Sequence, residues 1–331
     1  MNIKAGMIHP DLQGKGLFLR ALIPYFRPST FKLFNRMLFS MRGRRGKGMC
    51  YEQVFLPRLA GNAATGQLRL CVYRPLEAKE NVPGILWMHG GGYALGIPEQ
   101  DEGFIRSFVE KRGCVVVAPD YCLSTQAPYP AALEDCYAAL LWLKGHAAEL
   151  NVRPDRLMVG GESAGGGLAA ALAIYARDRN EVAIAFQMPL YPMLDDRMIT
   201  VSTRDNDAPV WNTKSNVNAW KLYLGALYGR EDVPTYAAPS RLENFSGLPP
   251  AFTYVGGIEP FCDETVQYME RLKAAGVQAE YHVFEGCYHG FDILAKRSAP
   301  ARQARALLME SFDRAVACCF ARQPQEWIPL P

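Results

Sequence analysis

The sequence predicts an α/β fold in which a mostly parallel central sheet of about eight strands is covered by helices on both faces. Short apolar runs alternate with helical patterns along most of the chain, and two glycine-rich motifs each follow a predicted strand. With 331 residues, 49% of them hydrophobic, the chain suits one α/β domain with an appended helical cap. The predicted strands span residues 53–56, 68–73, 85–88, 115–118, 157–159, 184–188, 252–255 and 281–284.

The first 50 residues are basic and apolar at the same time. They contain ten Lys or Arg residues against the single Asp11, a net charge of +9, whereas the whole chain carries +3. Apolar residues recur at helical spacing on either side of Pro24 and Pro28, which predicts two basic amphipathic helices. Such helices can bind an anionic membrane surface. The basic run of Arg42, Arg44, Arg45 and Lys47 is interpreted as a solvated linker rather than a nucleic-acid site.

A run of three glycines follows the predicted strand 84–88. The motif is His89, Gly90, Gly91 and Gly92. Glycines at such a place let consecutive backbone N–H groups converge on an oxygen that becomes negative in a tetrahedral intermediate, and a side chain there would block the substrate. We predict that the amides of Gly91 and Gly92 are two donors of an oxyanion hole and that the Ala164 amide is the third. The alternative is an ordinary glycine turn.

A second motif lies between a predicted strand, 156–160, and a predicted helix, 164–177. Its members are Gly161, Glu162, Ser163, Ala164 and Gly165. A strand-to-helix turn this sharp strains the backbone of Ser163 and exposes its hydroxyl, and both glycines lie where a Cβ would collide. A phosphate-binding turn is the alternative. No Gly-Lys-Ser/Thr follows Gly165 and no G-x-G-x-x-G spacing is present, so Ser163 is predicted to be a nucleophile.

A serine nucleophile of this kind needs an acid and a histidine later in the chain. Only His282 and His289 follow Ser163. His282 alternates within a predicted strand and is interpreted as structural. His289 lies in a loop just past a strand end, where a general base can reach the nucleophile.

Three acids compete for the remaining role: Glu259, Asp263 and Glu264. They follow the predicted strand 251–255, and Glu259-Pro260 is predicted to open a helix. Acids at a helix start favour the positive end of the helix dipole, which explains Asp263 and Glu264 without catalysis. Glu259 is nearest the strand end and is the first choice, with Asp263 as the alternative. It would accept the His289 Nδ1–H and stabilise the imidazolium.

From about Pro83 to Phe291, the chain resembles the hormone-sensitive-lipase-like branch of the α/β-hydrolases, the bacterial HSL-type esterases. The resemblance rests on His89 to Gly92 with Tyr93, on Gly161 to Gly166, on His289-Gly290-Phe291, and on residues 119–121 and 130–135. It implies an α/β-hydrolase fold, hydrolysis of short to medium acyl esters by a Ser-His-acid triad, no cofactor, a cap over the active site and a homodimer. The N-terminal helices are therefore interpreted as cap, with weak membrane-surface contact as the alternative.

The chain departs from the family pattern at three places. Glu259-Pro260-Phe261 stands where members usually have Asp-Pro-Leu, so the carboxylate is one methylene longer. Residues 121–126 lack an arginine and a carboxylate of the usual supporting loop. Glu162 replaces the commoner Asp before the nucleophile, and we expect it to hydrogen-bond nearby backbone, with a catalytic role left open.

The predicted organisation has three parts. Residues 1–48 form one cap segment and 191–248 a second, while 49–190 together with 249–331 form the catalytic domain. Aromatic residues of the second segment either line an acyl or alcohol pocket or simply pack against the core. Trp211 and Tyr93 are the candidate pocket residues.

Composition narrows the functional classes further. Nine cysteines in no paired pattern are typical of a reducing, cytoplasmic environment, and no CxxC or HExxH motif suggests a metal. No apolar run is long enough for a transmembrane helix, and no signal peptide is expected. Cys262 and Cys287 are either two unrelated thiols or an oxidation-sensitive pair near the triad. A non-catalytic small-molecule receptor and an amide or other acyl hydrolase are the rival functions.

Overall fold

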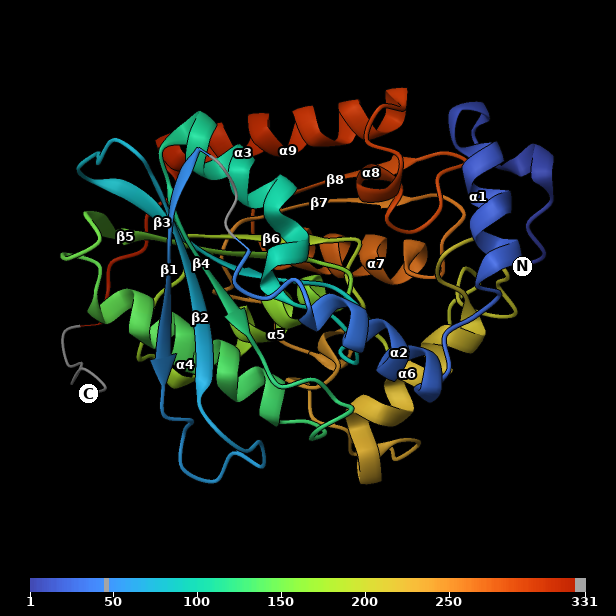
Figure 1. Ribbon diagram of the computed structural model, residues 1–331, viewed down its shortest axis with the longest axis horizontal. Coiled ribbons are helices and arrows are strands. Elements are labelled where there is room, and N and C mark those ends of the chain that lie inside the picture. Colours follow the sequence, from blue (N-terminus) through green and yellow to red (C-terminus); the bar gives the residue numbers. More distant parts are fainter. Residues whose placement is uncertain (45–47, 325–331) are drawn as a thin grey trace.

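The computed structural model describes residues 1–44 and 48–324, so Arg45 and Lys47 of the basic run lie outside the described residues. One eight-stranded sheet runs through the molecule in the order β1-β2-β4-β3-β5-β6-β7-β8 (Figure 1). β2 is antiparallel to both β1 and β4, and the remaining neighbours are parallel. The strands are β1 (Met49–Leu56), β2 (Leu68–Pro75), β3 (Val82–Met88), β4 (Val115–Asp120), β5 (Val152–Glu162), β6 (Phe186–Leu190), β7 (Ala251–Gly256) and β8 (Ala279–Phe284).

Helices cover both faces of this sheet. The helices α3 and α9 pack on one face and α4, α5 and α7 on the other, and each layer buries its own apolar cluster (Figure 1). The helices are α1 (Pro10–Leu22), α2 (Pro28–Phe39), α3 (Glu102–Arg112), α4 (Ala131–Gly145), α5 (Ala164–Arg179), α6 (Thr213–Leu224), α7 (Cys262–Ala274), α8 (Phe291–Leu294) and α9 (Ala299–Cys318), with short 3-10 turns at Ala5–Met7, Pro98–Asp101, Gly225–Leu227 and Pro239–Arg241.

All eight predicted strands are present, because continuous apolar runs are what a doubly covered parallel sheet requires. Every residue of the central strand β3 is buried, whereas most of the edge strand β8 is only half-buried. Several bounds differ: β1, β3 and β5 extend beyond the predicted runs, and the strand predicted as 184–188 spans Phe186–Leu190. Its ladder with β5 starts where Met158 pairs with Phe186, so Ile184 precedes the paired segment.

Helices from two distant parts of the chain meet at one end of the molecule. The helices α1, α2 and α6 gather there, together with the N-terminus (Figure 1). The Phe26 amide donates to Ser215 Oγ at 2.9 Å, and Asn218 Nδ2 donates to the Phe26 carbonyl at 2.7 Å. The segments 1–44 and 191–248 therefore share hydrogen bonds as well as packing. No helix in residues 1–44 and 48–324 has the length and apolar character needed to cross a bilayer.

Candidate active site

Ser163 occupies the turn between β5 and α5, with backbone angles φ 59° and ψ −118°. A β-carbon-bearing residue rarely adopts a positive φ, so the turn holds this serine in a strained conformation. The crowding predicted for the flanking glycines is present. A Cβ at Gly161 would overlap the Met88 carbonyl oxygen, and one at Gly165 would overlap the same atom. Only glycine allows strand β3 and helix α5 to approach this closely.

Three side chains form one hydrogen-bonded line at this turn. His289 Nε2 lies 2.8 Å from Ser163 Oγ, and His289 Nδ1 lies 2.7 Å from Glu259 Oε1. The exposed fraction is 3% for Ser163, 5% for His289 and 0% for Glu259. The fold thus brings His289 next to Ser163, 126 positions away in the sequence, and next to Glu259, 30 positions away. In this arrangement His289 can take the serine proton while Glu259 fixes the ring orientation.

Glu259 lies in a turn directly after β7. Its Oε2 accepts a hydrogen bond from the Gly256 amide at 3.0 Å, so both carboxylate oxygens have donors. Burial raises the pKa of Glu259, and the neighbouring His289 opposes that shift. The prediction that Glu259-Pro260 opens a helix was wrong by two residues: α7 begins at Cys262, because the turn first folds the carboxylate back toward Gly256.

The other two candidate acids are engaged elsewhere. Asp263 Oδ2 accepts a hydrogen bond from the Ser202 amide at 2.8 Å, and Glu264 Oε1 accepts one from the Leu194 amide at 2.7 Å. Both lie in the first turn of α7, as expected for helix-start acids. His282 stands on the edge strand β8 and its Nε2 contacts Glu280 at 3.0 Å. Only Glu259 among the three acids contacts His289 in the described part of the chain.

Within the described residues, the glycine run after β3 has amides without a hydrogen-bond acceptor. Gly91 and Gly92 have φ values of +122° and +60°. A Cβ at Gly91 would overlap the Leu95 carbonyl oxygen, so this conformation requires glycine. No protein atom in residues 1–44 and 48–324 accepts a hydrogen bond from the amides of Gly91, Gly92 or Ala164. These three N–H groups are therefore free to bind an oxyanion.

Several side chains hold this loop in place. The Gly90 amide donates to Glu162 Oε1 at 2.7 Å, as expected for the residue before the nucleophile. Tyr121 Oη donates to the His89 carbonyl at 2.7 Å, and Gln100 Nε2 donates to the Gly90 carbonyl at 3.2 Å. The roles of Tyr121 and Gln100 were not predicted, since neither residue carries a local signal for a contact with the glycine run.

Asn35 is a further support that the sequence analysis missed. It is 5% exposed, lies on α2, donates through Nδ2 to the Ala94 carbonyl at 2.9 Å and accepts from the Gly96 amide at 3.1 Å. The N-terminal segment is thus fastened to the backbone just after the glycine run. A signal did exist: Phe31 and Asn35 share the buried face of α2, and a polar side chain on such a face needs partners.

Of the two candidate pocket residues, Trp211 lies at the triad and Tyr93 lies in the core. The Trp211 and His289 rings are 6.2 Å apart, and Phe26 of the N-terminal segment lies 5.7 Å from Trp211. A Cβ on Gly92 would overlap the Trp211 ring. Tyr93 stacks on Tyr223 at 3.9 Å and donates its hydroxyl to the Met193 carbonyl, which accounts for its burial.

Burial shifts the pKa of several groups behind the nucleophile. Desolvation and the nearby Asp101 raise the pKa of Glu162 well above its usual range. Burial raises the pKa of Asp101 to about 7 and lowers that of His89 to about 4. His89 stacks on Tyr121 with ring centres 4.2 Å apart. The buried ring is therefore neutral in the folded protein near neutral pH.

Burial also affects the two cysteines that sequence analysis placed near the triad. It raises the pKa of both Cys262 and Cys287 to about 12, with Glu259 adding to each shift. Oxidants react with the thiolate, which is scarce at neutral pH for such groups. This chemistry favours the interpretation of two inert thiols over an oxidation-sensitive pair.

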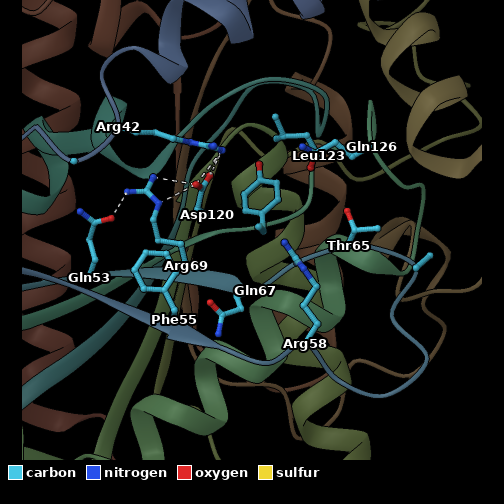
Figure 2. Close-up of a pocket in the computed structure, with 14 residues that line it drawn as sticks. Arg42, Gln53, Phe55, Arg58, Thr65, Gln67, Arg69, Asp120, Leu123 and Gln126 are labelled. Carbon is cyan, nitrogen blue, oxygen red and sulfur yellow. Dashed lines mark hydrogen bonds and ion pairs between the residues drawn. The ribbon is translucent and has the colours of Figure 1, made fainter.

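A separate polar pocket of about 460 Å³ lies where β4 ends (Figure 2). Its cations are paired: Arg69 contacts Glu99 at 2.6 Å and Asp120 at 2.9 Å, and Arg42 contacts Asp120 at 3.0 Å. Ser163, Glu259 and His289 do not line it. Tyr121 lines it and also supports the glycine loop, so this pocket adjoins the site without being part of it.

The fold is that of an α/β-hydrolase, and the hydrogen-bonded line of Ser163, His289 and Glu259 is consistent with that class. A family model described as "alpha/beta hydrolase fold" matches residues 85–293, and the chain belongs to that family. The esterase LipI of Mycobacterium tuberculosis is 34% identical over 70% of this chain and 73% of its own length. The carboxylesterase NlhH of the same species is 32% identical over 78% of this chain and 82% of its own length.

Solved structures resemble nearly the whole chain. A bacterial heroin esterase has a TM-score of 0.86 and 33% identity, covering 94% of this chain and 98% of its own. A hyperthermophilic esterase from the archaeon Pyrobaculum calidifontis has a TM-score of 0.80 and 29% identity, covering 93% and 99%. The predicted family and fold are therefore confirmed.

Proposed function

We propose that this protein is a carboxylic ester hydrolase that cleaves short to medium acyl esters through a covalent intermediate on Ser163. The observation that carries the proposal is the line from Ser163 Oγ through the His289 ring to Glu259, with contacts of 2.8 and 2.7 Å. The free amides of Gly91, Gly92 and Ala164 beside it supply the second requirement of acyl transfer. The relatives named as esterases support the same assignment.

The reaction follows from these positions. Ser163 Oγ attacks the ester carbonyl as its proton passes to His289 Nε2, and the carbonyl oxygen becomes an anion held by the three amides. The intermediate collapses when His289 returns the proton to the alkoxide, which leaves as alcohol, and the acyl group stays on Ser163. Water then loses a proton to His289, attacks the acyl-enzyme and releases the carboxylic acid and the free serine. Glu259 accepts the Nδ1–H throughout and stabilises each imidazolium. No cofactor takes part.

We propose further that residues 1–48 and 191–248 act as a two-part cap over this site. The hydrogen bonds of Phe26 with Ser215 and Asn218 support a single unit. Trp211, whose ring lies 5.7 Å from that of Phe26 and 6.2 Å from that of His289, would then form a wall of the ester pocket. Its aromatic face suits an acyl or alcohol group without charge.

The deciding experiment compares Ser163→Ala with the parent on nitrophenyl esters of graded chain length and on matching anilides. We expect ester turnover to fall at least about 10⁴-fold in the variant while the circular dichroism spectrum is unchanged. Ser107→Ala on α3 is the matched control. Retained turnover in Ser163→Ala would refute the assignment, and anilide cleavage at a comparable rate would make the protein an amidase as well.

Two properties of the whole protein are also proposed. The family resemblance implies a homodimer, and the edge strand β8, half-buried over most of its length, offers an unpaired sheet edge. All nine cysteines are free, which suits a reducing compartment and a cytoplasmic location. Light scattering coupled to size-exclusion chromatography tests the first property, and fractionation of the native cells tests the second.

A further inference from the structure

Exposed apolar side chains gather on the N-terminal helices. Of the eleven large hydrophobic side chains exposed in residues 1–44 and 48–324, six lie between positions 7 and 37. The most exposed of these are Phe18 (64%), Leu22 (63%), Met37 (61%) and Leu33 (60%). Scattered exposed hydrophobics are normal, but a concentration of this kind on two neighbouring helices marks an interaction surface.

The spacing places these side chains on the outer face of each helix. On α1, Phe18 and Leu22 are one turn apart, and the opposite face, with Leu12 and Gly16, is buried. On α2, the exposed Leu33 and Met37 are likewise one turn apart, while Phe31 and Asn35 are buried. Each helix therefore has apolar groups on the side that faces away from the protein. We call Phe18, Leu22, Leu33 and Met37 the outer apolar set.

Basic side chains accompany the outer apolar set. Residues 1–44 contain eight Lys or Arg and one acidic residue, Asp11, which gives a net charge of +7. Two of these cations are neutralised by acids outside the segment, because Arg20 pairs with Asp207 and Arg42 with Asp120. Lys32 and Arg36 are exposed on α2 next to Leu33 and Met37, and neither has an acidic partner within the described ranges. The exposed surface of α2 thus alternates cationic and apolar groups.

We propose that the outer faces of α1 and α2, which carry the outer apolar set, dock on an anionic lipid surface. A helix that offers apolar groups and unpaired cations together is suited to lie in a membrane interface, with the apolar groups among the acyl chains and the cations at lipid phosphates. A second copy of the chain fits poorly, because a two-fold interface would place this basic face against itself. The positive charge therefore favours a negatively charged binding partner, and the exposed apolar groups favour one with a hydrocarbon interior, such as a lipid bilayer.

The docking surface has a consequence for the proposed esterase function, on which this step rests. The buried face of α2 carries Asn35, which binds the backbone at Ala94 and Gly96 beside the glycine loop. The same helix would thus face lipid on one side and the catalytic loop on the other. A protein docked in this way would hold the glycine loop and α2 close to the membrane, where esters with apolar acyl groups concentrate.

The test is a flotation assay of the full-length protein with vesicles of phosphatidylcholine alone or mixed with phosphatidylglycerol in equal amounts. We expect binding to the anionic vesicles only, and weaker binding at high ionic strength. Replacing the outer apolar set by serine, or making the double variant Lys32→Glu/Arg36→Glu, should weaken binding at least about tenfold. The matched control is Leu76→Ser/Val201→Ser, which removes two exposed hydrophobics outside α1 and α2 and should bind as the parent does.

Three outcomes would overturn the proposal. The first is that the parent does not bind anionic vesicles even at low ionic strength. The second is that the control variant binds as weakly as the serine variant. The third is that the parent does not bind vesicles and the serine variant changes the oligomeric state, which would show that a second copy covers this face. Turnover of a water-soluble ester should stay unchanged in all these variants. Ser163→Ala should still bind vesicles, so loss of catalysis and loss of docking are separately visible.

Discussion

The amide of Gly90 donates a hydrogen bond to Glu162 Oε1 at 2.7 Å, which ties the residue before the nucleophile to the loop that supplies the free amides. The two halves of the site, which lie 72 positions apart, are therefore fixed relative to each other by one buried contact. Because oxyanion stabilisation depends on donor placement, we propose that Glu162 acts as a positioning residue.

The first prediction concerns this contact. Glu162→Gln keeps the acceptor oxygen and should keep kcat within about threefold, whereas Glu162→Ala leaves the Gly90 amide unpaired and should lower kcat by about 10- to 100-fold. The pKa of Glu162 is raised in the folded protein, so the folded state keeps its proton at a pH where the unfolded chain has lost it. The free energy of unfolding of the parent therefore falls as the pH rises above the pKa of Glu162 in the unfolded chain. Glu162→Gln should therefore gain stability over the parent with rising pH, as measured by urea unfolding. A constant difference would contradict this reasoning.

A second prediction separates the candidate acids. Glu259→Gln should lower kcat by about 10²- to 10⁴-fold, because an amide can neither hold the required His289 tautomer nor stabilise the imidazolium. Asp263→Asn, which changes a group bonded to the Ser202 amide instead, should leave kcat nearly unchanged. Steady-state kinetics on a soluble ester measures both. If Asp263→Asn were the more damaging change, Glu259 would lose its assigned role.

The third prediction tests the link between α2 and the catalytic loop. Asn35→Ala removes the hydrogen bonds to Ala94 and Gly96 and should lower kcat by about 10- to 100-fold with little change in KM, because the donors move while the pocket remains. Asn218→Ala is a control that removes only the bond to Phe26. Equal effects of the two substitutions on kcat would indicate general loosening of the N-terminal segment.

The fourth prediction uses the buried His89. Its pKa is lowered from 6.5 to about 4 by burial, so below pH 6.5 the unfolded chain binds a proton that the folded protein does not. Stability is then lost as the pH falls from about 6.5 toward 4, and His89 alone should cost about 2 kcal/mol between about pH 7 and pH 5. The stability difference between the parent and His89→Gln should shrink by that amount in urea titrations at the two pH values. A pH-independent difference would show that the ring titrates normally.

The fold could be predicted from the sequence because its signals are local. Valine- and leucine-rich runs identify buried parallel strands, and glycine-rich turns identify the ends that carry chemistry. The predicted ends of strands and helices were less accurate where hydrogen bonding to another segment, rather than local composition, decides where the element begins. Phe186 begins β6 because Met158 lies opposite, and the chain turns at Pro260 because Glu259 bonds back to Gly256.

Some residues of the site could also be predicted from the sequence, and others could not. Ser163 and His289 could be selected because each stands in a motif whose residue types are dictated by chemistry, and Glu259 because it is the acid nearest the end of the predicted strand. Gln100 and Tyr121 were missed because their partners are the backbone carbonyls of Gly90 and His89, and a backbone acceptor leaves no mark in the sequence. Asn35 was missed although its place beside Phe31 on the buried face of a helix is a signal that a polar side chain needs partners. Tyr93 was selected by its place in a motif, yet its ring belongs to the core.

The hydrogen bonds between Phe26 and α6 join positions separated by about 190 residues, at sequence distances of 189 and 192. During synthesis, the first two helices therefore leave the ribosome long before their binding site exists. At about 5–20 residues per second, they wait roughly ten seconds or more with their apolar sides uncovered. The sides of these helices that pack against α6 therefore stay uncovered until translation passes residue 224.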